Sequence, residues 1–151
     1  FVDTSAFIAI RVRDDVNHKR AYDFLQRIKE EKLRLHTTNF ILDEVYPYFS
    51  RSHEVAIGMA ELIMNNPLIT LHRVGVEDED NAFRTLKEYG DKDFSYTDAV
   101  SFAVMERLGL TIVFAFDEHF AQYGKFVRLT RFFCLYLSLK HLFFALAGLC
   151  R

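Results

Sequence analysis

Two aspartates stand where strand-forming residues stop. Asp3 follows Phe1 and Val2 at the start of the sequence, and Asp117 closes the segment TIVFAFD. In an open parallel sheet, ligands bind outside the carboxyl ends of the strands. Either aspartate alone is more often the cap of the helix that follows it. At the equivalent ends of two strands, the pair favours a functional site.

Two further carboxylates could join them. Asp98 ends the segment Ser95-Tyr96-Thr97-Asp98, which matches the capping box at the start of many helices. A helix that begins there lies at the same end of the sheet, so Asp98 can cap the helix, border the cleft, or do both. Glu44 lies inside the helical segment TTNFILDEVYPYF. Taken alone, it is typical of a solvated helix position, as is its neighbour Asp43.

Carboxylates that share one cleft cannot all stay ionised without a counter-charge. A divalent metal ion supplies that charge, and all-oxygen ligands suit Mg²⁺ or Mn²⁺ better than zinc. His119 is near Asp117, but no second histidine or cysteine with zinc spacing accompanies it. A metal ion that binds a water molecule at an acidic site is typical of enzymes that hydrolyse phosphodiester bonds. The residues alone therefore predict a metal-dependent α/β hydrolase.

The elements that would hold these residues alternate along the chain. We expect strands at 1–2, 33–38, 68–74, 111–116 and 126–129, and helices at 4–10, 17–32, 39–50, 54–64, 77–88 and 97–108. Strands that alternate with helices predict a parallel sheet covered on both faces. The chain has 151 residues and 50% hydrophobic residues, which fits one folded domain. Its net charge of −2 gives no overall basic signature of nucleic-acid binding, although a local basic patch can exist.

Residues 130–151 differ in composition, because they contain no acidic residue and are rich in leucine and phenylalanine. Ser138, Lys140 and His141 interrupt them too often for a transmembrane helix. We expect a C-terminal helix that packs on the domain or on a partner subunit. An interfacial membrane helix and a non-native origin are the alternatives.

The two cysteines, Cys134 and Cys150, cannot form a disulfide framework, so a reducing, cytoplasmic setting is the default. No signal peptide is visible. Because the sequence starts at Phe1 rather than at a methionine, a short piece of the first strand is expected to precede it.

Four motifs, VDTSAF, TTNFILDE, YTDAVSFAVM and FAFDEHF, resemble the PIN domain family, in particular its VapC-type toxin ribonucleases. Each motif is weak alone, whereas their order and spacing are fairly specific. The resemblance covers residues 1–129, as a PIN-like nuclease domain, and not the tail. It implies a three-layer α/β/α sandwich with a central parallel sheet. It also implies an acidic metal site made of Asp3, Glu44, Asp98 and Asp117.

The resemblance further implies a Mg²⁺- or Mn²⁺-dependent endoribonuclease that cleaves RNA and acts as the toxin of a toxin–antitoxin pair. A small antitoxin protein and a second copy of the chain in a homodimer are the expected partners, and membrane association is not expected. The alternative is a catalytically silent PIN module that binds RNA or a protein. A haloacid-dehalogenase-like phosphatase needs D-x-D where this chain has Asp3-Thr4-Ser5, and the acidic pair and lysine of a response receiver are not evident.

Three hydroxyl residues adjoin the carboxylates. Ser5 follows Asp3 by two positions, Thr38 ends the second strand, and Thr97 precedes Asp98. We expect each to cap a helix, a role that is compatible with supporting the site.

RNA binding needs positive charge near the cleft, because phosphate contacts dominate affinity. The strongest candidates are Arg11, Arg13, Lys19 and Arg20, although a solvated helix face is the commoner role for any one of them. Tyr96 and Phe120 flank two of the carboxylates and could stack on bases. Packing in the core is the commoner fate of such aromatic residues.

Overall fold

Parallel strands form the centre of this computed structural model, which describes residues 1–129. Strand β1 (Leu35–Thr38) pairs in parallel with β2 (Ile69–His72), and β3 (Ile112–Val113) pairs in parallel with β4 (Val127–Arg128). The predicted parallel sheet is therefore confirmed. The observed strands are shorter than the predicted ones.

The start of the chain joins the two strand pairs. Val2 forms a parallel bridge with Phe114, next to β3, and its N–H donates to the carbonyl of His36 in β1 at 2.8 Å. The Thr37 hydroxyl also donates to the Val2 carbonyl, at 3.0 Å. The order across the sheet is thus β2, β1, the Val2 segment, β3 and β4. The predicted first strand is a single bridging residue, because the chain turns into a helix immediately after Asp3.

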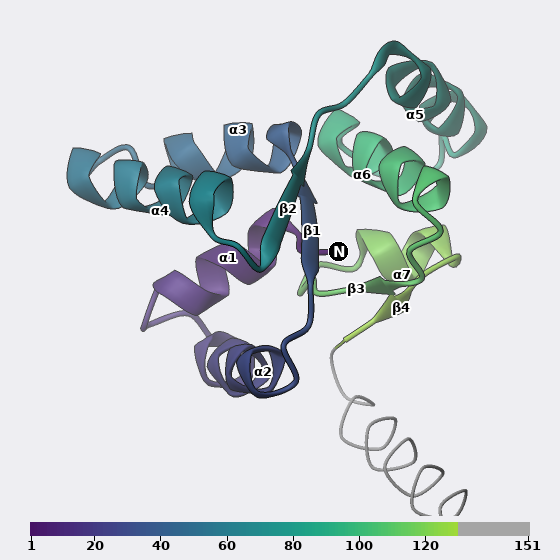
Figure 1. Cartoon of the computed structure of the whole chain (residues 1–151). Coiled ribbons are helices and arrows are strands. Elements are labelled where there is room, and N and C mark those ends of the chain that lie inside the picture. Colours follow the sequence, from purple (N-terminus) through teal and green to yellow (C-terminus); the bar gives the residue numbers. More distant parts are fainter. Residues whose placement is uncertain (130–151) are drawn as a thin grey trace, which may run out of the picture.

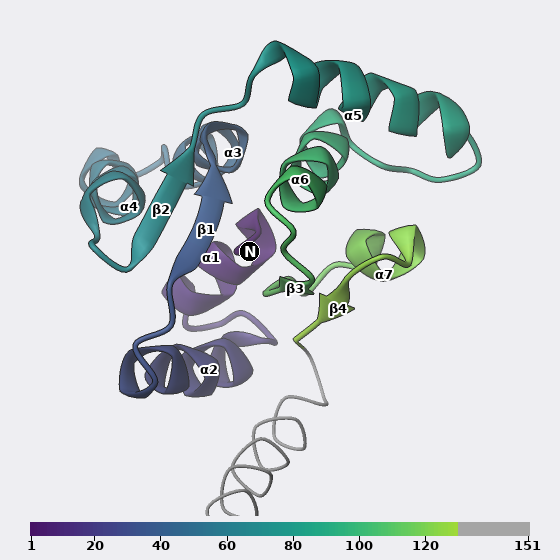
Figure 2. The same ribbon diagram turned by 45° about the vertical axis from the view of Figure 1, so that its right-hand side comes forward.

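Helices lie on both sides of these strands, as a three-layer α/β/α sandwich requires (Figure 1). Helices α1 to α4 form one group, and α5, α6 and α7 form the other, which the rotated view in Figure 2 also shows. Their bounds are α1 Thr4–Arg11, α2 His18–Glu30, α3 Asn39–Tyr48, α4 His53–Asn65, α5 Val76–Glu88, α6 Tyr96–Arg107 and α7 His119–Tyr123.

Helix α6 lies in the core, because its residues from Asp98 to Met105 are all buried. A helix that is buried on every side needs small or apolar side chains around most of its circumference, and the buried stretch of this helix reads DAVSFAVM. The Phe102 ring stacks on Tyr123 at 4.2 Å between centroids and meets the edge of Phe120 at 5.1 Å. Phe120 is fully buried in this cluster, so it belongs to the core and is not available to stack on a base.

An ion pair joins the first turn of α5 to the last turn of α6. Arg107 donates from Nε to Asp78 Oδ1 at 2.7 Å and from Nη2 to Oδ2 at 3.0 Å. Asp78 also caps its own helix by accepting from the Gly75 N–H at 3.1 Å. Burial works against the charge of Asp78, but the bonds from Arg107 and Gly75 outweigh it and hold the pKa of this carboxyl below its usual range.

The predicted C-terminal helix and both cysteines fall outside the described residues. Across residues 1–129, no helix combines the length and apolar character needed to cross a membrane.

We expect Arg107→Met to lower the free energy of unfolding by about 2 kcal/mol at neutral pH. The substitution leaves the buried Asp78 charge unpaired, and half-exposure of the arginine discounts the full cost of breaking a buried pair. Because the folded-state pKa of Asp78 is depressed, its stabilisation is present at neutral pH and lost in acid. The loss in the variant should therefore shrink below about pH 4, near the usual aspartate pKa. Urea unfolding at several pH values measures this.

Lys125→Met is the matched control, since Lys125 pairs with the neighbouring Glu106 on the surface. An exposed pair of this kind contributes less than about 1 kcal/mol. Equal losses in the two variants would contradict a special role for the Asp78–Arg107 pair.

Candidate active site

Pairing of the sheet at Val2 and Phe114 brings Asp3 and Asp117 together. The Asp3 N–H donates to the Phe114 carbonyl at 3.0 Å, which fixes the end of the first segment beside the end of β3. Asp3 is only 5% exposed, and its carboxylate caps α1 by accepting from the Ser5 N–H at 2.9 Å. The two aspartates expected at equivalent strand ends are therefore neighbours.

The Ser5 hydroxyl connects these two carboxylates. Its Oγ lies 2.6 Å from Asp3 Oδ2 and 3.1 Å from Asp117 Oδ2, and it accepts from the Phe116 N–H at 2.9 Å. The prediction that Ser5 caps the first helix is wrong, because Asp3 occupies the N-cap position. A serine two residues after a capping aspartate has its hydroxyl turned back toward that carboxylate, where it reaches the second one.

Asp3 carries an electrostatic cost. Burial, followed by the negative charge of Asp117, raises the pKa of the Asp3 carboxyl well above its usual range, although the bonds from Ser5 act in the opposite direction. Asp3 and Asp117 are both acidic, so neither supplies a positive charge that would stabilise the other.

Asp98 approaches the same place from α6. Its Oδ2 accepts from the Ser95 N–H at 2.8 Å and from the Ser95 hydroxyl at 2.7 Å, while the Asp98 N–H donates back to Ser95 Oγ at 3.0 Å. The predicted capping box is confirmed, and Asp98 both caps the helix and faces Asp117. Thr97 is half-buried beside it, and the bonds to the carboxylate come from Ser95 and His119, not from Thr97.

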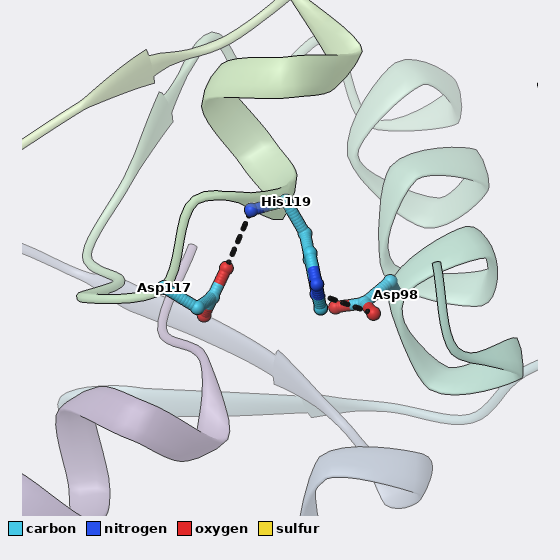
Figure 3. Close-up of side chains that lie close together, drawn as sticks. All are labelled: Asp98, Asp117 and His119. Atoms are coloured by element: carbon cyan, nitrogen blue, oxygen red, sulfur yellow. Dashed lines mark hydrogen bonds and ion pairs between the residues drawn. The ribbon is translucent and has the colours of Figure 1, made fainter. Parts of the chain in front are cut away.

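His119 links Asp98 with Asp117, as Figure 3 shows. Its main-chain N–H donates to Asp117 Oδ1 at 3.0 Å, and its ring Nδ1 lies 2.8 Å from Asp98 Oδ2. Potential ligand atoms of Asp98, Asp117 and His119 all lie within 4.8 Å of one another. Sequence reasoning considered this histidine only as a zinc ligand. The signal that could have placed it is its position two residues after Asp117, at the first residue of α7.

Glu44 contacts α1 and is not one of the residues whose potential ligand atoms meet within 4.8 Å. Its side chain is half-buried, and Oε2 accepts from the Thr4 hydroxyl at 2.6 Å, next in the chain to Asp3. Thr38 caps α3 as predicted, by accepting from the Ile41 N–H at 3.2 Å. Asp43 is exposed, so the two adjacent acids of α3 differ in their surroundings. Thr4, which the sequence did not single out, bonds Glu44 and follows Asp3 directly in the chain.

The four predicted RNA-binding cations separate into different environments. Arg11 and Arg13 are exposed, whereas Lys19 forms an ion pair with Asp23 at 3.0 Å. The guanidinium of Arg20 lies 5.6 Å from the centre of the Phe116 ring, beside Asp117 in the chain.

Arg128 is a cation that sequence reasoning missed. It donates to the Asp117 main-chain carbonyl and, at 2.9 Å, to Glu118 Oε2. Arg128 therefore fixes the loop that carries Asp117, from the last strand of the sheet.

Comparison with known proteins places this geometry in a family. The family model described as PIN domain matches residues 1–126. The 23S rRNA-specific endonuclease VapC20 of Mycobacterium tuberculosis is 29% identical over 127 residues, which cover 82% of this chain and 93% of that protein. A VapC ribonuclease of Archaeoglobus fulgidus is 30% identical over 122 residues, which cover 80% of this chain and 78% of that protein.

A solved structure agrees with these matches. The crystal structure of M. tuberculosis VapC20, described as a sarcin-ricin loop cleaving toxin, superposes with a TM-score of 0.73 at 30% identity, and the match covers 84% of this chain and 95% of that one. The chain belongs to the PIN domain family, and its relatives are VapC ribonucleases.

We expect Asp3→Asn to stabilise the metal-free protein at neutral pH, because the pKa of Asp3 is raised in the fold and its negative charge therefore costs stability. Asparagine keeps an oxygen for Ser5 and removes the buried charge that opposes Asp117. Because the folded-state pKa of Asp3 is raised, its contribution to stability is complete in acid and lost as the pH rises through that pKa. The gain in the variant should therefore grow from about pH 4 toward neutral pH.

Thermal or urea unfolding in EDTA at pH 4.5 and 7.5 tests this expectation. Asp43→Asn makes the same chemical change at an exposed position and should leave stability nearly unchanged at both pH values. A less stable Asp3→Asn protein at pH 7.5 would show that the Asp3 charge is compensated within the fold.

Proposed function

We propose that this chain, a PIN domain protein, is a metal-dependent endoribonuclease that hydrolyses RNA phosphodiester bonds at a site built from Asp3, Glu44, Asp98 and Asp117. The observation that carries the proposal is the meeting of Asp98, Asp117 and His119 within 4.8 Å, joined through Ser5 to the buried Asp3. So many acidic groups at one place require a cation.

The side chains fit Mg²⁺ or Mn²⁺. Carboxylate oxygens are the ligands that these ions prefer, and a divalent charge would offset the repulsion that raises the pKa of Asp3. Asp3, Asp98 and Asp117 would hold the ion, with Glu44 at the edge of the site. When bound, the ion lowers the pKa of a water nucleophile and stabilises the leaving oxygen.

The remaining residues position these carboxylates. Ser5 holds Asp3 and Asp117 in a fixed relation to each other, and Thr4 holds Glu44. Ser95 and His119 both bond Oδ2 of Asp98, which leaves its Oδ1 for a cation. The His119 ring, with Nδ1 2.8 Å from Asp98 Oδ2, orients the Asp98 carboxylate. Fixed ligands of this kind lower the cost of organising the site for each reaction.

The comparisons support RNA as the substrate class, because the similar proteins are named as an rRNA-specific endonuclease and as a ribonuclease. By the same similarity we propose that the chain is the toxin of a toxin–antitoxin pair and that a small antitoxin protein silences it. A homodimer and a cytoplasmic location remain predictions from the family resemblance.

We expect the purified protein to cleave a mixed RNA pool with Mg²⁺ or Mn²⁺ and to stop when EDTA is added. Asp98→Asn and Asp117→Asn should each lower kcat by at least about 100-fold, because a metal ion contributes several kcal/mol of transition-state stabilisation. The measurement is initial cleavage rate on a labelled RNA, with metal binding followed in parallel by calorimetry.

Asp43→Asn is the matched control, since Asp43 is the exposed neighbour of Glu44, and its rate should equal that of wild type. Cleavage that survives EDTA or the loss of Asp98 would point to another site or to a contaminant. A protein that binds RNA, binds no metal and yields no cleavage product would instead be a silent PIN module.

We also propose that residues 1–129 contain the whole nuclease function, since the family match ends at residue 126 and Leu129 packs against the core. A chain that ends at Leu129 should cleave RNA with unchanged kcat. Loss of kcat in a folded truncated protein, with folding checked by circular dichroism, would assign residues 130–151 a part in the site.

A further inference from the structure

A hollow of about 350 Å³ away from the carboxylates collects positive charge. Arg11 and Arg13 line it from the end of α1, and Arg51 lines it from the connection between α3 and α4. Tyr48 and Phe49 complete its aromatic wall. No acidic residue lines it, although the chain as a whole has a net charge of −2.

Within residues 1–129, the three arginines of this hollow have no acidic partner. All three are exposed, and in the part of the chain covered by the structure none of them forms an ion pair, in contrast to Lys19 with Asp23 and Arg128 with Glu118. The acidic residues nearest to them in sequence, Asp14, Asp15 and Glu54, lie outside the lining. Three uncompensated guanidinium groups around one concavity attract an anion, and arginine binds phosphate through paired N–H donors.

The aromatic wall adds a second type of contact. Tyr48 is 53% exposed, and its ring meets Phe49 edge to face at 4.9 Å between centroids, which keeps the tyrosine in place. Proteins that bind single-stranded nucleic acid combine positively charged grooves with exposed aromatic rings on which bases stack. An isolated anion would need the arginines only, so this combination favours a polynucleotide.

The hollow lies at the C-terminal ends of α1 and α3, the helix that follows Asp3 and the helix that carries Glu44. Helix α1 begins at Thr4, directly after its cap Asp3, and ends at Arg11, while α3 carries Glu44 and ends at Tyr48. The Thr4–Glu44 hydrogen bond fixes the helices to each other, and Figure 1 shows both running from the sheet toward the same outer side. From Thr4 to Arg11 the helix rises by about 10 Å, a distance that an extended RNA strand covers within a few nucleotides.

We propose that the hollow formed by Arg11, Arg13, Arg51, Tyr48 and Phe49 binds the single-stranded RNA that flanks the phosphodiester held at the carboxylates. The choice of RNA rests on the proposed function, whereas binding in the hollow does not depend on cleavage. Of the four cations predicted from sequence, Arg11 and Arg13 belong to this site, and Arg51 joins them from a segment that sequence reasoning did not consider.

The test is binding of a fluorescein-labelled single-stranded RNA to the full chain in EDTA, over a series of salt concentrations. In the triple variant Arg11→Gln, Arg13→Gln, Arg51→Gln, the slope of log affinity against log salt should become shallower by about 2, since each lost phosphate contact removes roughly 0.7. Tyr48→Ala should weaken binding with no change in that slope, because it removes stacking and no charge.

The matched control is Lys29→Gln, Arg84→Gln, Lys87→Gln, which removes the same charge from exposed positions on α2 and α5. Its slope should match that of wild type. An equal change in both triple variants would mean that only net charge matters and would overturn the proposal, as would an unchanged slope in the arginine variant.

Two further outcomes separate the proposals. Arginine-dependent RNA binding by a protein that never cleaves RNA would overturn the proposed nuclease and support this site. Cleavage with an unchanged kcat and KM in the arginine variant would support the proposed nuclease and overturn the RNA site in the hollow. Polyglutamate that competes with RNA as strongly as unlabelled RNA of equal charge would indicate a site for an acidic peptide instead, and would overturn the RNA assignment.

Discussion

The backbone pairing of Val2 with Phe114 is the contact on which the rest of the structure depends. Together with the Val2–His36 hydrogen bond, it joins the strand pair β1–β2 to the pair β3–β4, which are otherwise two separate two-stranded sheets. The same pairing puts Asp3 and Asp117 at adjacent strand ends, where their charges oppose each other. The pairing that completes the sheet therefore also brings the two aspartates of the acidic site together.

Around this contact, the polar groups of the site are satisfied by short local bonds. Asp3 and Asp98 each use their carboxylate to begin a helix, and each receives a serine hydroxyl from within the first turn of that helix or from its cap. A capping carboxylate is stabilised by the helix it begins. This makes helix starts suitable places to hold negative charge in a partly buried site: Asp3 is the N-cap of α1, and Asp98 is the capping-box partner of Ser95, the N-cap of α6.

Much of this arrangement is visible in the sequence, and the invisible part has a common cause. The alternating elements, the parallel sheet, the caps at Ser95 and Thr38 and the clustering of strand ends follow from local patterns. Side-chain partners that lie far apart in sequence do not. The Thr4–Glu44 bond, the Ser5 link to Asp117 and the contribution of Arg51 depend on how helices pack, which no short segment encodes. Strand lengths were overpredicted for a related reason: residues 115–116 are strand-like by type, but the chain leaves the sheet there to present Asp117.

The separation of the paired residues along the chain has a consequence for synthesis. Ser5 and Asp117 are 112 positions apart, and Val2 and Phe114 are separated by the same number of positions. During translation, the first segment leaves the ribosome long before the residues that complete the sheet and the acidic cluster. A nascent chain therefore lacks an assembled site until nearly all of residues 1–129 have emerged. If the proposed nuclease activity holds, an incomplete chain would have no assembled site with which to cleave RNA.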